Sequence, residues 1–232
     1  MNKQWISGLI IAKIEKNVSA KIFFLLKYAV LGIFTYIFKT KEQKIMLTIK
    51  TVSQDAEVKG ILALQQKNLK KNLTPEVIAS QGFVTVEHQY EVLKAMNDAE
   101  PSVIAKDGET VVGYCLAMLS QFRDGVPELK PLFDLLDQVG YDGKKLKDYK
   151  YFVMGQVCVG EGYRGEGVFD KMYQHLKEKL SDRYQLCVTD IARSNVRSQK
   201  AHARVGFEFI YEFFDANLNE HWRIVVWDWR KK

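Results

Sequence analysis

Hydrophobic and polar residues follow two periodicities along the chain from residue 46 onward. Seven short runs have the alternation, or the β-branched and aromatic composition, that is typical of strands. They cover residues 47–52, 102–106, 110–119, 151–159, 184–190, 207–214 and 221–229. Apolar residues at helical spacing predict helices over residues 54–69, 89–98, 168–180 and 195–206. Because no repeats or low-complexity linkers interrupt it, this pattern predicts one domain over residues 46–232.

Residues with strong positional preferences mark several helix ends. Ser53 and the pair Ser194-Asn195 are the expected N-caps of the helices that follow them, and Thr74 precedes a proline at a further helix start. Gly206 is the expected left-handed stop of the helix that Asn195 begins.

The first 45 residues differ from the rest of the chain because they are both basic and hydrophobic. Residues 22–38 form a mostly apolar run that Lys27 and Gly32 interrupt, and as a helix the run would span about 25 Å. This is slightly short of the ~30 Å hydrocarbon core of a bilayer. Lysines flank the run on both sides, so the charge distribution predicts no orientation.

Two hypotheses account for this extension. Residues 22–38 could be a membrane anchor, which would make the protein membrane-associated. Alternatively, Met46 is the native start, since it opens directly onto an alternating strand pattern, and residues 1–45 are a dispensable product of start-site choice. We favour the second hypothesis and, with it, a cytoplasmic protein. No small-x-small cleavage site follows the apolar run, which argues against a signal peptide.

The net charge of +6 arises entirely in this extension. Residues 1–45 contain eight lysines and two glutamates, whereas the remainder of the chain has 26 basic and 26 acidic residues. A nucleic-acid-binding domain is expected to carry a basic excess on its folded surface. We therefore expect no nucleic acid among the partners.

The three cysteines, Cys115, Cys158 and Cys187, each fall within a strand-like apolar run. No two of them have the spacing of metal ligands, and the odd number argues against a disulfide framework. They are interpreted as small buried hydrophobes of a protein in a reducing compartment. No metal site is predicted.

Residues 120–150 are the longest stretch without a regular pattern, apart from a short apolar segment at 132–136. A loop of this length in a compact domain is usually a functional lid or is disordered. We expect it to border the functional site.

A glycine-rich turn between a strand and a helix is the strongest chemical signal in the chain. Residues 157–159 are apolar, four glycines follow between positions 160 and 167, and an amphipathic helix begins near Val168. This arrangement directs free backbone N–H groups and the positive end of a helix dipole toward an anion. The anion is interpreted as a phosphate group of a cofactor.

Two cofactors compete for this turn, and the first is a dinucleotide. Residues 160–165 match the G-x-G-x-x-G fingerprint, and Asp190 ends the next strand, where the ribose-binding acid would lie. Three observations argue against it. The helical pattern begins after the third glycine, only 42 residues follow Asp190, and no βαβαβ repetition precedes the turn.

Read from Arg164 instead, the same turn carries a different signature. The sequence Arg164-Gly-Glu-Gly-Val-Phe169 resembles the Q/R-x-x-G-x-G/A loop of the GNAT acetyltransferase superfamily. A second block, from Asn195 to Gly206-Phe207, is similar to that family's asparagine-containing helix ending in Gly-Phe. The resemblance covers residues 46–232 in element order and is specific over about 150–210.

The resemblance implies an α+β (mixed α/β) fold with a mixed, mostly antiparallel sheet of six or seven strands. About four helices would flank the sheet, which would be splayed open between its fourth and fifth strands, with acetyl-CoA in the opening. The implied cofactor-binding residues are Val157, Cys158, Val159, Arg164, Gly165, Glu166, Gly167, Val168, Phe169 and Asn195.

The activity that the resemblance implies is that of an N-acetyltransferase. The acetyl group would move directly from acetyl-CoA to a primary amine in a ternary complex, and the acceptor would be a small molecule or a protein amine. A homodimer is compatible with the sequence.

Departures from the family pattern leave the catalytic residues open. Gln156 stands where many relatives carry a glutamate, and it cannot accept a proton. His202 stands where many relatives carry a tyrosine, which makes it the candidate general acid; packing beside the cofactor is the alternative. The proton of the amine could leave through water, Glu161, Asp190 or His88. If the departures abolish turnover, the domain would be a non-catalytic acyl-CoA-binding module.

Overall fold

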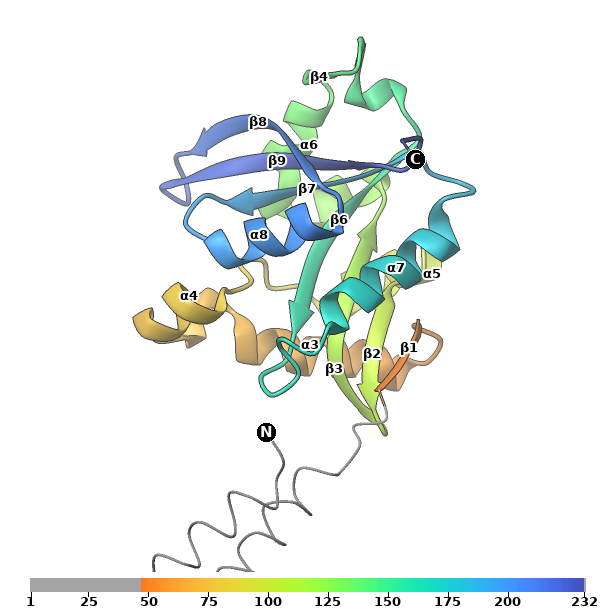
Figure 1. The fold of residues 1–232 in the computed structure, drawn as a ribbon, viewed down its shortest axis with the longest axis vertical. Helices are drawn as coiled ribbons and strands as arrows, with labels where there is room; N and C mark the ends of the chain where they lie inside the picture. The colour runs from red at the N-terminus through yellow and green to blue at the C-terminus, as the bar shows by residue number, and fades with distance from the viewer. Residues whose placement is uncertain (1–46, 232) are drawn as a thin grey trace, which may run out of the picture. The chain divides into compact units, whose positions relative to one another are not determined.

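A seven-stranded sheet runs through residues 47–231, the part of the chain that the computed structural model describes (Figure 1). Its strands are β1 (Leu47–Thr51), β2 (Val103–Asp107), β3 (Thr110–Met118), β6 (Tyr151–Val159), β7 (Leu186–Ala192), β8 (Glu208–Asp215) and β9 (Glu220–Asp228). Their order is β1-β2-β3-β6-β7-β9-β8; β6 and β7 are parallel, and the other neighbouring pairs of this sheet are antiparallel. The predicted mixed, mostly antiparallel sheet is confirmed.

The sheet opens between its fourth and fifth strands, β6 and β7, as predicted. Backbone pairing of the two strands covers only residues 151–153 of β6 and 186–188 of β7. At the end of this joined part, the hydroxyl of Thr189 donates a hydrogen bond of 2.8 Å to the carbonyl of Met154. Beyond Met154 the two strands diverge and leave one edge of β6 without a neighbouring strand.

A bulge in β6 lies at the point of divergence. Leu116 of β3 pairs with Gln156, whereas the next residue, Ala117, pairs with Met154, so Gly155 is an extra residue in β6. An extra residue bends its strand and increases the local twist. The bulge therefore turns the second half of β6 away from β7.

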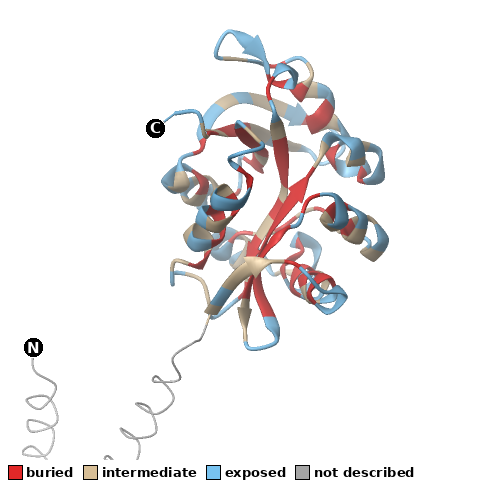
Figure 2. Cartoon of the chain, turned by 90° about the vertical axis from the view of Figure 1, so that its right-hand side faces the viewer, coloured by how far each residue is buried: buried red, intermediate tan, exposed pale blue. Residues whose placement is uncertain are grey.

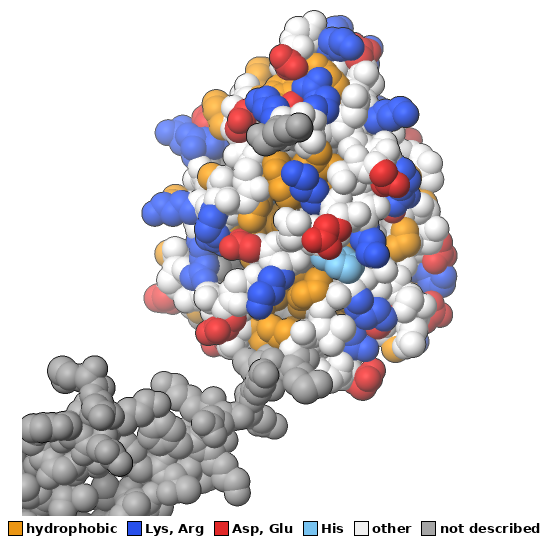
Figure 3. Space-filling view, turned by 45° about the vertical axis from the view of Figure 1, so that its right-hand side comes forward, with side chains coloured by type: hydrophobic (Ala, Val, Ile, Leu, Met, Phe, Trp, Pro, Cys, Tyr) orange, Lys and Arg blue, Asp and Glu red, His pale blue; other side chains and the backbone are white. Residues whose placement is uncertain are grey.

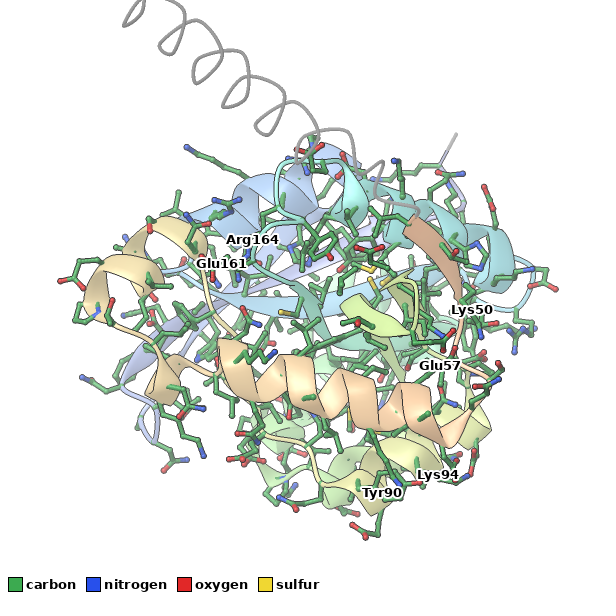
Figure 4. The ribbon with its side chains drawn as sticks, turned by 90° about the horizontal axis from the view of Figure 1, so that it is seen from below. Lys50, Glu57, Tyr90, Lys94, Glu161 and Arg164 are labelled. Carbon is green, nitrogen blue, oxygen red and sulfur yellow. The ribbon has the colours of Figure 1, made fainter. Side chains whose placement is uncertain are left out.

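Helices cover both faces of the sheet. Four have ten or more residues: α3 (Asp55–Asn68), α5 (Tyr90–Ala99), α7 (Val168–Leu180) and α8 (Val196–Val205). Two are shorter: α4 (Pro75–Gln81) and α6 (Lys130–Leu136). Buried residues of α3, α5 and α6 share one apolar core, and those of α7 belong to a second core on the other side of the strands (Figures 1 and 4).

The central strands are buried on both faces (Figure 2). In β3, Tyr114 and Leu116 belong to the core beneath α3, whereas Cys115 and Ala117 belong to the core beneath α7. Burial on both sides explains why this strand is an almost continuous apolar run in the sequence. Cys115 and the other two cysteines are buried free thiols, which confirms their interpretation as packing residues.

Three predicted helix ends are confirmed. Thr74 Oγ1 accepts a hydrogen bond from the N–H of Val77 at the start of α4. Asn195 Oδ1 accepts one from the N–H of Ser198 at the start of α8. Gly206 ends α8 in the left-handed region, with φ of 114°.

The prediction that Ser53 caps α3 is wrong. Gln54 is the residue at the N-cap position, and its side chain makes no capping bond. The backbone N–H of Ser53 instead donates to the buried Glu57 carboxylate, to which Lys50 and Lys106 also donate. Burial alone would raise the pKa of Glu57, but these hydrogen bonds lower it to about 2. A charged network thus replaces the expected hydroxyl cap.

Residues 120–150 are more regular than predicted. They contain 3₁₀ turns at Ser120–Gly125, Pro127–Leu129 and Leu146–Asp148, the helix α6, and a small hairpin of β4 (Gly140–Tyr141) and β5 (Lys144–Lys145). The apolar segment 132–136 lies in α6, where Leu132, Phe133 and Leu136 are buried. Burial of this segment against the core orders a stretch whose sequence shows no clear periodicity.

The predicted division into residues 1–45 and 46–232 stays a prediction. The apolar run 22–38 lies outside the described residues. Within residues 47–231, no helix has the combined length and apolar character required to cross a bilayer.

Candidate active site

A large cavity of about 510 Å³ lies where β6 has separated from β7. It is bounded by the end of β6, the glycine turn, the first turns of α7 and α8, and residues 81–84. Nine of the ten predicted cofactor-binding residues line it: Val157, Cys158, Val159, Arg164, Gly165, Gly167, Val168, Phe169 and Asn195. Glu166 lies in the same turn but outside the residues that line the cavity. The structure thus brings two distant sequence blocks to one place.

The glycine turn has the backbone geometry of an anion-binding loop. Gly165 and Gly167 have φ of 86° and 73°, and no atom lies within 4 Å of the position that a Cβ would take at either residue. Among the described residues, no group accepts a hydrogen bond from the N–H groups between Gly165 and Asp170. Free N–H groups at the start of α7 can therefore bind phosphate oxygens.

Arg164 holds the turn in place. Its Nε donates to the carbonyl of Val159 at 2.8 Å, and its guanidinium also donates to Asn68 Oδ1 of α3. Arg164 and Glu161 both project at this turn, far from the Lys50–Glu57 ion pair (Figure 4). Arg164 therefore fixes the conformation of the turn in addition to placing a positive charge beside the cavity.

Basic side chains surround the large cavity. Arg164, Arg197, Lys200 and Arg204 line it, together with one acidic residue, Asp170, which forms an ion pair with Arg204 at 2.7 Å. On the face drawn in Figure 3, by contrast, basic and acidic side chains are interspersed. The local excess of positive charge suits a ligand with several phosphate groups.

Asn195 is engaged within the protein. Its Oδ1 caps α8, and its Nδ2 donates to the carbonyl of Phe83 at 3.2 Å. Gly82 has φ of 77°, and a Cβ there would lie 2.9 Å from Asn195 Oδ1. The close approach of residues 82–83 to α8 therefore requires glycine, and a cofactor that bonds to the amide of Asn195 would displace Phe83.

A small cavity of about 90 Å³ adjoins the large one at the same opening of the sheet. The two cavities share five lining residues, Phe83, Val84, Val157, Asn195 and Ser198. Glu128, Leu129, Pro131 and Leu132 of the 120–150 stretch also line the small cavity, which agrees with the expectation that this stretch borders the site.

Three side chains were predicted as possible proton acceptors, and Asp190 is the one of them that lines a cavity. It lines the small cavity, whereas Glu161 and His88 line neither cavity. Asp190 is half-buried, and this partial loss of hydration, together with the negative charge of Asp215, raises its pKa to about 7. A carboxylate with this pKa is well suited to accept a proton near neutral pH.

Gln156 is a structural residue of β6. Its Oε1 accepts hydrogen bonds from Tyr114 at 2.6 Å and Gln65 at 2.8 Å, and its Nε2 donates to the carbonyl of Val86 at 2.8 Å. Gln65 Nε2 also donates to Nδ1 of His88, and burial lowers the pKa of His88 to about 4. This network ties the bulged strand to α3 and residues 86–88.

His202 is buried, with 2% of its surface exposed. Its Nδ1 donates to the carbonyl of Ser198 at 2.8 Å, so its Nε2 accepts the hydrogen bond of 2.8 Å from the Tyr173 hydroxyl. Burial lowers the pKa of His202 to about 4. The acid role of His202 stays a prediction. This geometry favours the packing alternative, because a neutral imidazole whose two nitrogens are both hydrogen-bonded lacks the acidic proton of an imidazolium.

Several residues at the site carry no sequence motif. Residues 81–84 reach the large cavity because they pack beside Asn195, and Asp215 reaches the small one from the end of β8. A carboxylate at the end of an aromatic strand is only a weak sequence signal for a functional residue. That Asp215 lies in the same cavity as Asp190 follows only once the strand order is known.

The comparisons with known proteins agree with this architecture. The model of the acetyltransferase (GNAT) family matches residues 71–207. Since the match spans more than half of the chain, the protein belongs to the GNAT acetyltransferase family. Among curated protein sequences no match is found.

Solved acetyltransferase structures share the fold at low sequence identity. The ribosomal-protein-S18-alanine N-acetyltransferase from Escherichia coli is 11% identical, with a TM-score of 0.51 over 79% of this chain and 94% of that chain. A putative acetyltransferase from Salmonella typhimurium, solved with its cofactor acetyl-CoA, is 14% identical, with a TM-score of 0.52 over 80% and 95%. Likeness at this identity shows the fold alone.

Proposed function

We propose that this protein transfers the acetyl group of acetyl-CoA directly to a primary amine in a ternary complex. The junction of the two cavities carries this proposal. Nine predicted cofactor positions line the large cavity, Asp190 lines the small one, and both share Val157 of β6. A thioester in the large cavity and an amine in the small one would meet at this strand.

The large cavity would hold the donor. The free N–H groups at the start of α7 would bind the pyrophosphate, and Arg197 and Lys200 would add positive charge. The pantetheine arm carries amide groups, which can pair with the unpartnered edge of β6 as a further strand would. The structural neighbour from Salmonella typhimurium, solved with acetyl-CoA, supports this choice of cofactor.

Direct transfer is favoured over a covalent acetyl-enzyme. Cys158 lines the large cavity, but burial raises the pKa of its thiol to about 12. A thiol with this pKa stays protonated at neutral pH and is a poor nucleophile. The amine would therefore attack the thioester itself, Asp190 would accept its proton, and backbone N–H groups of β6 would stabilise the oxyanion.

Two measurements on the full-length protein test the proposal. Isothermal calorimetry should detect binding of acetyl-CoA, and thiol release from acetyl-CoA should depend on an added primary amine. The Gly165→Trp variant should lose binding, because its side chain would enter the large cavity from a residue with φ of 86°.

The control for backbone strain is Gly143→Trp in the β4–β5 hairpin. Gly143 has φ of 80° and open space around its Cβ position, but it lies outside both cavities. Binding should persist in this variant. Retained affinity in Gly165→Trp would refute the site. Binding without turnover of any amine would identify a non-catalytic acyl-CoA-binding module instead.

A further inference from the structure

The two cavities carry opposite charge. Asp190, Asp215 and Glu128 line the small cavity, and no lysine or arginine is among the described residues that line it. The rings of Phe213 and Trp222 form part of its wall. Carboxylates and aromatic rings without a basic partner are the groups that bind ammonium cations in proteins.

The strand register directs Asp190 and Asp215 to the same face of the sheet. Asp190 of β7 pairs with Ile224 of β9, and Asp215 of β8 pairs with Glu220 of β9. Positions 220 and 224 are an even number of residues apart, so their side chains lie on one face, and directly paired residues share that face. Glu128, Leu129, Pro131 and Leu132 also line the cavity.

The two carboxylates have no positive partner among the described residues. The Asp190 carboxylate accepts a hydrogen bond from its own backbone N–H, and no side chain of the described residues is paired with it. Asp215 is only 9% exposed, and its Oδ1 accepts bonds from the N–H groups of Asn217 and Leu218, which leaves Oδ2 without a donor. Burial of adjacent, unpaired negative charge is unfavourable, and a bound cation would offset this cost. The raised pKa of Asp190 is a consequence of the same arrangement.

The size of the small cavity limits what can enter. Its volume of about 90 Å³ is several times the 10–15 Å³ or so that admits one water molecule by the same kind of measure. An unbranched chain of a few atoms fits such a space.

We propose that the acceptor is a short, unbranched primary amine with a second cationic group, held with its reacting nitrogen at Asp190 and its distal ammonium at Asp215. This inference rests on the proposed acetyl transfer and adds the class of acceptor. The lone pair of the reacting nitrogen forms the new C–N bond as the C–S bond breaks, and the electron pair leaves on the thiolate. Asp190 accepts the proton from nitrogen, while the distal ammonium keeps its charge.

Three amines of equal length test this inference in the thiol-release assay with acetyl-CoA. They are 1,4-diaminobutane, n-butylamine and 4-aminobutanoate, whose distal groups are cationic, neutral and anionic. The kcat/KM of the diamine should exceed that of n-butylamine by about tenfold or more, since a hydrogen bond to a charged group is typically worth that factor. The amino acid should be the poorest acceptor of the three.

The Asp215→Asn variant should lose most of the preference for the diamine while its affinity for acetyl-CoA stays unchanged. Asparagine keeps the oxygen that the N–H groups of Asn217 and Leu218 require, so the turn should remain folded, which a thermal melt checks. Asp124→Asn is the matched control, because Asp124 is an exposed carboxylate of the 120–150 stretch outside both cavities. It should retain the wild-type preference.

Equal kcat/KM for the three amines, or no turnover of the diamine by a protein that acetylates other amines, would overturn this inference and leave the proposed function intact. Absence of acetyl-CoA binding would instead refute the proposed function. An unchanged diamine preference in Asp215→Asn would remove Asp215 from the acceptor site and overturn the inference as stated.

Discussion

The two cavities at the opening of the sheet are built in different ways. The large cavity takes its anion-binding loop from one continuous stretch, Val157 to Phe169, whose backbone N–H groups and glycines act together, and α8 adds basic side chains to it. The small cavity takes its carboxylates from β7, from β8 and from the 3₁₀ turn Pro127–Leu129, at positions 190, 215 and 128. The anion-binding loop is formed by local sequence, whereas the group of carboxylates is a product of the tertiary fold.

This difference also separates the two tasks of a group-transfer site. A ligand common to many enzymes can be bound by a short motif that is independent of the rest of the chain. The partner in the reaction is selected by residues that meet only when the sheet is assembled. The charge of the two cavities follows this division, since the large one is basic and the small one is acidic.

The largest expected effect concerns Asp190. The Asp190→Asn variant should lower kcat by about 10²–10⁴-fold, because it removes the proton acceptor from the small cavity. Its calorimetric affinity for acetyl-CoA should not change, since Asp190 is absent from the residues that line the large cavity. A loss of acetyl-CoA affinity equal to the loss of kcat would contradict the separation of the two cavities.

The pH profile provides a second measurement on the same residue. Asp215, Glu128 and His202 line the small cavity together with Asp190, whose pKa is raised to about 7. The wild-type kcat/KM should therefore fall about tenfold per pH unit below pH 7 as the Asp190 carboxylate becomes protonated. The residual kcat/KM of Asp190→Asn should not fall in this way below pH 7. If the same decrease persists in the variant, it arises from another titratable group.

A smaller effect is expected from Lys200 in the large cavity. Lys200→Glu should raise the KM for acetyl-CoA about three- to tenfold by reversing one exposed charge, with kcat nearly unchanged. The effect should shrink at high ionic strength. Lys179→Glu, an exposed reversal in the last turn of α7, is the control. An equal effect of both variants would show that only net charge matters.

The smallest kinetic effect is expected from His202, which lines the small cavity. His202→Phe should change kcat by less than about threefold and destabilise the fold by about 1–3 kcal/mol, because Tyr173 loses its partner. The lowered pKa of His202, about 4, means that the unfolded chain binds its proton at higher pH than the folded chain. Wild-type stability should therefore fall as pH drops below about 6.5, and less steeply in the variant. A hundredfold loss of kcat at full stability would restore the acid role.

Much of the fold could be predicted from the sequence because its signals are local. All seven strands, the cap at Asn195 and the stop at Gly206 follow from periodicity and from single residues with strong preferences. The cofactor loop is predictable for the same reason. The cap at Ser53 failed because the helix begins one residue later, with Gln54 at the N-cap position, and the Ser53 hydroxyl instead accepts a hydrogen bond from Lys50 of β1.

The acceptor site could not be predicted in the same way. Asp190 was one of several candidate bases, and nothing in the sequence near Asp215 indicates that it lies beside Asp190. Their proximity depends on β9 lying between β7 and β8, which is a property of strand order. The buried segment of α6 shows the same limit, since its order comes from the core that it covers.

The bulge at Gly155 has a consequence for how ligands enter. Because an extra residue in the covalent chain bends β6, the parting of the strands is a property of the chain itself. An incoming molecule therefore does not have to break backbone hydrogen bonds between β6 and β7, and its binding free energy is not reduced by that rupture. The opening between β6 and β7 is therefore a fixed feature of the sheet, and one inserted residue, Gly155, determines its width. Deletion of Gly155 would extend the pairing of the two strands into the space that acetyl-CoA would occupy.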